Sequence, residues 1–294
     1  MHSDMWLQPF QPPRKAIRQG FDLKKKHAHV MGENYVHSPD GKGKEHEETF
    51  RSAFKINDKD VRFGNTFFKN LGDGKFVEMS DKANLETFWP WGAVPGDFDN
   101  DGFEDVFIPA GMGFPYGYWP SSLMMNNGNE TFTDRAKERG IEPPSGGEYN
   151  EEKIDNMPSP RSCRCAAVAD FDGDGRLDLV VNNFNGRAYY FRNQFPKKNY
   201  IAFRLTGSRH LRESGSNRDA VGALVTLHIG KEIMVRQVHP AGGYLSQSSY
   251  ALHFGLGNRT KVDWAEIRWP RGQREPIDNP EINKLHQRTE PKGK

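Results

Sequence analysis

GDFDNDGFEDVF (residues 96–107) and ADFDGDGRLDLV (residues 169–180) are two stretches of this sequence that share one pattern. Each places four aspartates within nine residues, includes a glycine, and continues into an apolar run that is typical of a β-strand. Carboxylates this close repel one another by about 1 kcal/mol per pair even in water. The pattern therefore predicts a bound cation, or alternatively a solvated, metal-free turn.

The spacing of the acidic residues favours the cation. Calcium loops place oxygen ligands at alternate positions, a glycine at position 6 for the sharp turn, and a backbone carbonyl at position 7. The aspartate at position 9 would then close the coordination shell. We therefore expect about two Ca²⁺ sites, because calcium takes six to eight hard oxygen ligands. The expected ligands are Asp97, Asp99, Asp101, the Phe103 carbonyl and Asp105 in the first loop, and Asp170, Asp172, Asp174, the Arg176 carbonyl and Asp178 in the second.

These loops are not EF-hands. Position 12, where an EF-hand carries a bidentate glutamate, is Ile108 in the first loop and Val181 in the second. The residues that follow are strand formers and do not start a helix. We therefore expect calcium to have a structural role, in which it stabilises a tight turn between two strands.

Internal repeats surround the two loops. FFKNLGDGKFVEMS (67–80) and LMMNNGNETFTDRA (123–136) both read as hairpins with turns of Gly, Asn and Asp. We interpret the unit as a hairpin, a spacer, an aspartate loop and a strand, with a third partial start at AYYFRNQ (188–194). The segment 143–160 has the composition of an exposed loop. Repeats of this size predict an all-β chain with a partial β-propeller.

The pattern of apolar and polar residues changes after residue 198. Short strand candidates follow one another, and Val225, Leu227 and Ile229 alternate with polar residues. This pattern predicts a small β-sandwich-like domain. The expected organisation is a poorly ordered polar segment at 1–60, propeller repeats at 61–198 and the second β domain at 199–294.

Longer motifs in both regions resemble known families. WPWGAVPGDFDNDGFEDVF (89–107) and its repeat resemble the FG-GAP/VCBS repeats of integrin-α-type propellers. GSNRDAVGALVTLHI (215–229), GGYLSQSSYALHFGLG (242–257) and VDWAEIRWPRGQ (262–273) are similar to an ASPIC/UnbV domain. The combination resembles the C-terminal portion of cartilage-acidic-protein-like proteins. Such propellers typically have about seven blades, so a longer parent chain or oligomerisation would supply the missing ones.

The resemblance implies an adhesion or binding protein at an extracellular, periplasmic or cell-surface location, although no signal peptide is visible at the N-terminus. Its partner would be a protein or a glycan. The balance of 41 Lys+Arg against 39 Asp+Glu does not indicate nucleic acid, and no apolar run reaches the ~18 residues of a membrane span. Cys163 and Cys165 are expected to be small core residues.

A candidate ligand-binding loop is rich in aromatic residues, which could stack on sugars, anchor a protein partner or fold inward. Its aromatic residues are Phe114, Tyr116, Tyr118 and Trp119. Ser246 with His239 or His253 could suggest a nucleophile and base, but no strand–GxSxG–helix context accompanies them. We expect a non-catalytic, calcium-binding protein. The alternatives are a carbohydrate-active enzyme or its accessory carbohydrate-binding module, and a purely structural fragment.

Overall fold

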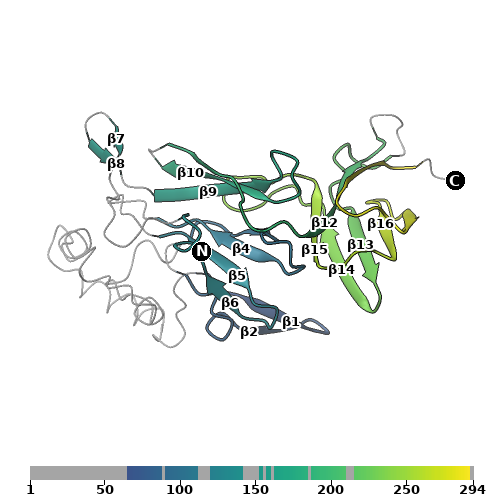
Figure 1. Ribbon diagram of the computed structural model, residues 1–294, viewed down its shortest axis with the longest axis horizontal. Coiled ribbons are helices and arrows are strands. Elements are labelled where there is room, and N and C mark those ends of the chain that lie inside the picture. Colours follow the sequence, from purple (N-terminus) through teal and green to yellow (C-terminus); the bar gives the residue numbers. More distant parts are fainter. Residues whose placement is uncertain are drawn as a thin grey trace, which may run out of the picture.

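The computed structural model is all-β in the part of the chain that it describes, as the sequence predicts (Figure 1). The described residues are 65–87, 90–111, 120–141, 152–154, 157–159, 162–184, 187–209 and 215–291. Within these ranges, no helix is long and apolar enough to cross a membrane. The expected polar segment at residues 1–60 and the four aromatic residues of the candidate ligand loop, Phe114, Tyr116, Tyr118 and Trp119, lie outside the described residues.

The N-terminal half consists of small antiparallel sheets. A four-stranded sheet has the order β3-β4-β5-β6, and a three-stranded sheet has the order β11-β10-β9. Two separate hairpins, β1-β2 and β7-β8, complete this half, and β7-β8 lies in the segment that we expected to be an exposed loop. The strands are β1 (Phe68–Gly72), β2 (Lys75–Glu78), β3 (Val94–Gly96), β4 (Asp105–Ile108), β5 (Ser122–Asn126), β6 (Phe132–Asp134), β7 (Glu152–Ile154), β8 (Met157–Ser159), β9 (Ser162–Ala169), β10 (Asp178–Phe184) and β11 (Tyr189–Phe191).

The pairing of the strands corrects the repeat unit that the sequence suggested. Each aspartate loop joins the first two strands of a sheet, β3 to β4 or β9 to β10, and the hairpin after the loop continues the same sheet. The sequence pattern instead predicts a unit of each loop with the hairpin before it. The reason is physical: β5 is the next strand along the chain and pairs antiparallel with β4, whereas the segment between β2 and β3 leads to another sheet.

The sheets pack face to face like successive blades, and Figure 1 shows β9 and β10 above β4, β5 and β6, with β1 and β2 below. One core contains Val94 of β3, Phe107 of β4 and Val168 of β9. A second core joins Met79, after β2, to Met124 of β5. The described residues form an open array and no closed ring.

Neither cysteine forms a disulfide bond. Cys163 is a buried core residue, as expected, and its thiol donates to Asn183 at 3.0 Å, whereas Cys165 is only half-buried.

The C-terminal half is a sandwich of two sheets around one core. Sheet β15-β12-β18 faces sheet β14-β13-β16-β17, and β12 and β18 are parallel. Val225 and Leu227 of β13 are fully buried and Ile229 packs against the same core, so the predicted alternation is confirmed. The strands are β12 (Asn199–Thr206), β13 (Leu224–Ile229), β14 (Glu232–Gln237), β15 (Leu252–Gly257), β16 (Trp264–Arg268), β17 (Arg274–Asp278) and β18 (Leu285–Thr289).

A buried carboxylate closes one end of the sandwich. Glu290, just after β18, accepts hydrogen bonds from the backbone N–H and the hydroxyl of Ser208, at 3.0 and 2.7 Å. The N–H and hydroxyl of Ser216 each donate to it at 2.7 Å. Burial acts to raise the pKa of Glu290, but these four donors prevail and lower it to about 2.

We expect Glu290→Gln to destabilise the sandwich by about 2–3 kcal/mol at pH 7, because the amide loses the charge that four donors surround. Since the folded-state pKa lies below the ordinary value of 4.5, the carboxylate stabilises the fold above pH 4.5 and loses this effect as pH falls toward 2. Urea unfolding should therefore show the two proteins converging below pH 4.5. Glu281→Gln, at an exposed ion pair with Lys284, is the matched control and should leave stability nearly unchanged, because solvent screens an exposed pair. A pH-independent difference would contradict this role.

Candidate metal sites

The first aspartate loop connects β3 to β4, and its own backbone holds its shape. The two carboxylate oxygens of Asp97 accept the N–H groups of Asp101 and Gly102, at 3.0 and 2.8 Å. Asn100 and Gly102 have positive φ values of 56° and 103°, which let the chain turn sharply around this carboxylate. The glycine expected at position 6 therefore serves the predicted turn.

Three carboxylates of this loop converge. Asp97, Asp99 and Asp105 each offer an oxygen, and these oxygens lie within 4.8 Å of one another. Asp97 and Asp105 are almost fully buried, with 2% and 1% exposure. Burial is the main cause that raises the pKa of Asp97 to about 7 and that of Asp105 to about 8, and the neighbouring carboxylates add to it. Burial is also the main cause that raises the pKa of Asp101.

The chemistry of this donor set fits a hard divalent cation. Lys198 lies 3.1 Å from Asp99, and Arg259 is close enough to lower the pKa of Asp101. Within the described residues neither cation forms an ion pair with Asp97 or Asp105, and burying a charge is costly unless it is paired. A bound Ca²⁺ would supply that charge and favour the ionised forms.

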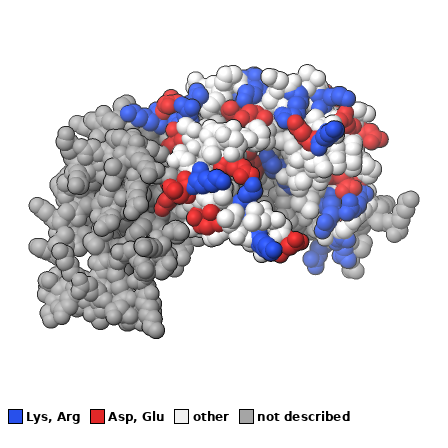
Figure 2. All heavy atoms as spheres, turned by 90° about the horizontal axis from the view of Figure 1, so that it is seen from below, with Lys and Arg blue, Asp and Glu red and all other residues white. Residues whose placement is uncertain are grey.

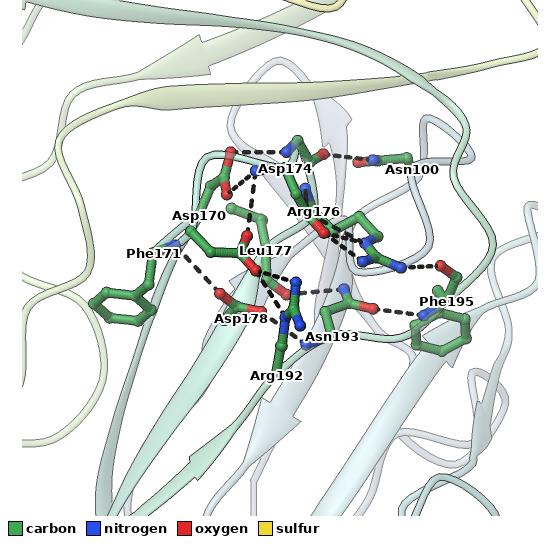
Figure 3. Close-up of polar contacts among 12 residues, drawn as sticks. Asn100, Asp170, Phe171, Asp174, Arg176, Leu177, Asp178, Arg192, Asn193 and Phe195 are labelled. Atoms are coloured by element: carbon green, nitrogen blue, oxygen red, sulfur yellow. Dashed lines mark hydrogen bonds and ion pairs between the residues drawn. The ribbon is translucent and has the colours of Figure 1, made fainter.

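The second loop repeats the same turn between β9 and β10 (Figure 3). Asp170 accepts the N–H groups of Asp174 and Gly175 at 3.0 and 2.9 Å, as Asp97 does in the first loop. Here the converging carboxylates are Asp170, Asp172 and Asp174, whose oxygens also lie within 4.8 Å of one another. This cluster is more exposed than the first.

Two arginines partly neutralise the second loop. The guanidinium of Arg176 binds Asp174, and that of Arg192 lies 2.7 Å from Asp172 (Figure 3). The Arg176 side chain also donates to the carbonyl of Phe195 at 2.7 Å. The pKa of Asp174 is lowered, chiefly by its hydrogen bond with Arg176. A cation at this site would therefore compete with two guanidinium groups for the same oxygens.

The position-9 aspartate links the first loop to the rest of its sheet. Its two oxygens accept the N–H of Phe98, at the start of the loop, and the N–H of Asn126, at the end of β5. The distances from Asp105 are 3.0 and 2.8 Å. Asp105 is also one of the three converging carboxylates, so it can bind a cation while it holds the strands.

The second loop has the same link. Asp178 accepts the N–H of Phe171 at 3.2 Å and that of Asn193 at 2.7 Å, and the hydroxyl of Tyr190 donates to it at 3.0 Å. The three acids that converge in this loop do not include Asp178. Asp101 is likewise absent from the converging set of the first loop. The roles of all these residues as metal ligands stay predictions, as does coordination by the carbonyls of Phe103 and Arg176.

The sequence reasoning missed several residues that connect the loops. The side-chain amide of Asn193 donates to the carbonyls of Phe98 and Leu177, at 2.7 and 2.9 Å. A signal was available, because Asn70 and Asn126 occupy the same place in two hairpins and Asn193 follows β11 in the third, partial repeat. Each side-chain oxygen caps the N–H two residues later.

The histidine and serine that suggested catalysis have other partners. His253 is half-buried, stacks on Tyr200 and lies with its Nε2 2.7 Å from Asn100 Oδ1. Loss of solvation is the main cause that lowers the pKa of His253 to about 4, and the positive charge of Arg236 adds to it. The ring is therefore neutral at pH 7. The hydroxyl of Ser246 donates to the carbonyl of Gly242 at 2.7 Å.

Comparison with known families matches three segments of the chain. An FG-GAP-like repeat covers residues 56–108, which include β1 to β4 and the first loop. An FG-GAP repeat covers 166–191, with the second loop and its three strands, and "ASPIC and UnbV" covers 213–294. The chain carries FG-GAP repeats and an ASPIC/UnbV domain. Strand β12 precedes the matched ASPIC/UnbV segment, although it is a central strand of the same sandwich.

The same combination relates the chain to cartilage acidic protein 1. It is similar to the proteins of that name from Xenopus tropicalis (25% identity over 264 residues), Mus musculus (30% over 218) and Homo sapiens (28% over 218). Each comparison covers 71% of this chain but 38%, 29% and 28% of the relative, respectively. The chain therefore spans about a third of the length of these relatives.

The ASPIC/UnbV domain approaches the first FG-GAP loop so closely that a glycine is required. A Cβ atom on Gly255 would lie 2.1 Å from Asp97 Oδ2 and 2.5 Å from the Cα of Asn100. We expect Gly255→Ala to lower the free energy of unfolding by about 1–3 kcal/mol through this overlap. Gly242→Ala, where the nearest atom lies 3.9 Å away, should cost less than about 0.5 kcal/mol. Equal effects in urea unfolding would contradict the close approach.

Proposed function

We propose that this chain is a calcium-stabilised, non-catalytic part of an extracellular binding protein. The observation that carries the proposal is the buried pair Asp97 and Asp105, which face Asp99 with one lysine nearby. Asp97, Asp99, Asp101, the Phe103 carbonyl and Asp105 would hold one Ca²⁺. Asp170, Asp172, Asp174, the Arg176 carbonyl and Asp178 would hold a second. The cation would supply counter-charge, and the chain's own residues set the turn and the strand pairing.

One observation supports an extracellular location, and a second bears on the class of partner. The relatives are named for cartilage, a matrix tissue, which favours an extracellular location. Figure 2 shows Lys and Arg side chains interspersed with Asp and Glu over the described part of one face, which does not favour nucleic acid. The proposed partner is a protein or glycan of extracellular type.

Removal of calcium should lower the melting temperature by about 5–10 °C, since saturation of a site at 100 times its Kd adds about 2.7 kcal/mol. Calorimetry with calcium and with a chelator measures this shift, and native mass spectrometry counts the ions. Asp97→Asn should abolish most of the shift. The control is Asp73→Asn in the exposed β1-β2 turn, which should keep it. An unchanged melting temperature with no bound metal would refute calcium binding.

Calcium binding at the first loop should release protons near neutral pH. In the cation-free protein the raised pKa values of Asp97 and Asp105 mean that these groups oppose folding increasingly as pH rises from about 4 to 8. Calcium binds the ionised forms, so its affinity should weaken as pH falls from 8 to 6. Titration calorimetry at pH 7 in buffers with different protonation enthalpies measures the released protons. A binding heat that does not depend on the buffer would contradict this mechanism.

The two loops should bind calcium with unequal affinity, because Arg176 and Arg192 compete only at the second. Arg192→Gln should strengthen the weaker site, whereas Arg274→Gln, at an exposed pair in the sandwich, should change neither site. Calcium titration of the three proteins measures both affinities. A strengthened tight site with an unchanged weak site would reverse this assignment.

A further inference from the structure

The first aspartate loop faces the sandwich through one asparagine. The carbonyl of Asn100 accepts the N–H of Gly257, at the end of β15, at 2.7 Å. Its side-chain oxygen lies 2.7 Å from His253 Nε2, and its amide donates to the carbonyl of Gly175 in the second loop at 2.8 Å. Asn100 is only 1% exposed. This residue therefore joins both loops to the sandwich.

The surrounding contacts leave little room for the loop to move while the sandwich stays in place. The Asp97 carboxylate lies directly against Gly255, as described above. A Cβ on Gly102 would lie 3.3 Å from the Arg259 guanidinium. Arg236 of β14 forms an ion pair of 3.1 Å with Glu104, on the other side of the loop. A change in the shape of the loop would therefore disturb its contacts with β14 and β15.

A second contact between the two halves does not use the carboxylates of either loop. The segment after β14 runs along the free edge of β9, where the N–H of Ser249 donates to the carbonyl of Val168 at 3.0 Å. The N–H of Val168 donates in turn to the hydroxyl of Ser248 at 3.2 Å. Trp91 and Tyr244 also pack together, with ring centroids 5.1 Å apart. This attachment should persist when the first loop changes.

We infer that the first loop is a calcium-dependent joint between the repeats and the sandwich. The inference rests on the proposed binding of calcium at this loop. Asn100 stands between Asp99 and Asp101, so its position depends on theirs. When a cation holds these acids together, Asn100 holds Gly257 and His253. When the cation leaves, the acids on either side of Asn100 lose the ion that held them together, so Asn100 is no longer fixed in position. The β15 end of the sandwich then detaches while the edge of β9 stays attached.

Hydrogen exchange of the whole chain, with and without calcium, tests the joint at residue resolution. The amide of Gly257 reports the bond to Asn100, and it should exchange at least about tenfold faster after chelation. The amide of Ser249 reports the contact with β9, and that of Leu227 reports the sandwich core. These two should change by less than about twofold.

A variant pair separates the joint from calcium binding. Asn100→Gly keeps the positive φ of 56° and the backbone carbonyl that accepts Gly257, but it removes the side-chain bonds to His253 and Gly175 that hold this carbonyl in place. The amide of Gly257 should therefore exchange faster than in the unaltered chain even with calcium bound. Native mass spectrometry should still find the calcium ions. Asn279→Gly makes the same change at a positive φ of 45° on an exposed turn, and its Gly257 should behave as in the unaltered chain.

The outcomes distinguish the two proposals. Absence of bound calcium would refute the proposed function and the joint together. Bound calcium with unchanged Gly257 exchange upon chelation would refute the joint alone. Equal acceleration at Leu227, Ser249 and Gly257 would show a general loss of stability and would also refute the joint.

Discussion

Two buried carboxylates, Asp97 and Asp105, organise the centre of this structure. One holds the turn of the first loop and the other ties that loop to the next hairpin. The burial that makes these hydrogen bonds effective also makes the charges costly without a counter-ion. The strand pairing of the β3-β4-β5-β6 sheet and the approach of the sandwich both depend on how that cost is met.

The two loops show how different surroundings change the chemistry of one sequence pattern. Both loops fold their backbone around the first aspartate and use the ninth to reach the following hairpin. In the first loop the sandwich packs against Asp97, whereas in the second Arg176 and Arg192 reach the acids from the loop itself and from the strand end. The same ligands are therefore expected to differ in calcium affinity.

The architecture also gives the ASPIC/UnbV domain a structural relation to the FG-GAP repeats. Within the described residues, the sandwich contacts the repeats at the first loop, at the second loop where Tyr200 lies against Gly175, and along the free edge of β9. Covering this edge satisfies backbone groups that would otherwise remain open. The repeats and the sandwich thus share an interface that includes both the proposed calcium site of the first loop and the edge of β9.

Local patterns in the sequence determined the strands, the aspartate turns, the alternation of Val225 and Leu227, and the families that these motifs represent. These features depend on near neighbours, whose spacing is visible in the chain. Only the tertiary structure decided which hairpin shares a sheet with which loop, and that Asn100, Gly255 and His253 meet at the first loop. Those contacts join residues more than 150 positions apart, and shape and burial select them. No local spacing encodes such a contact.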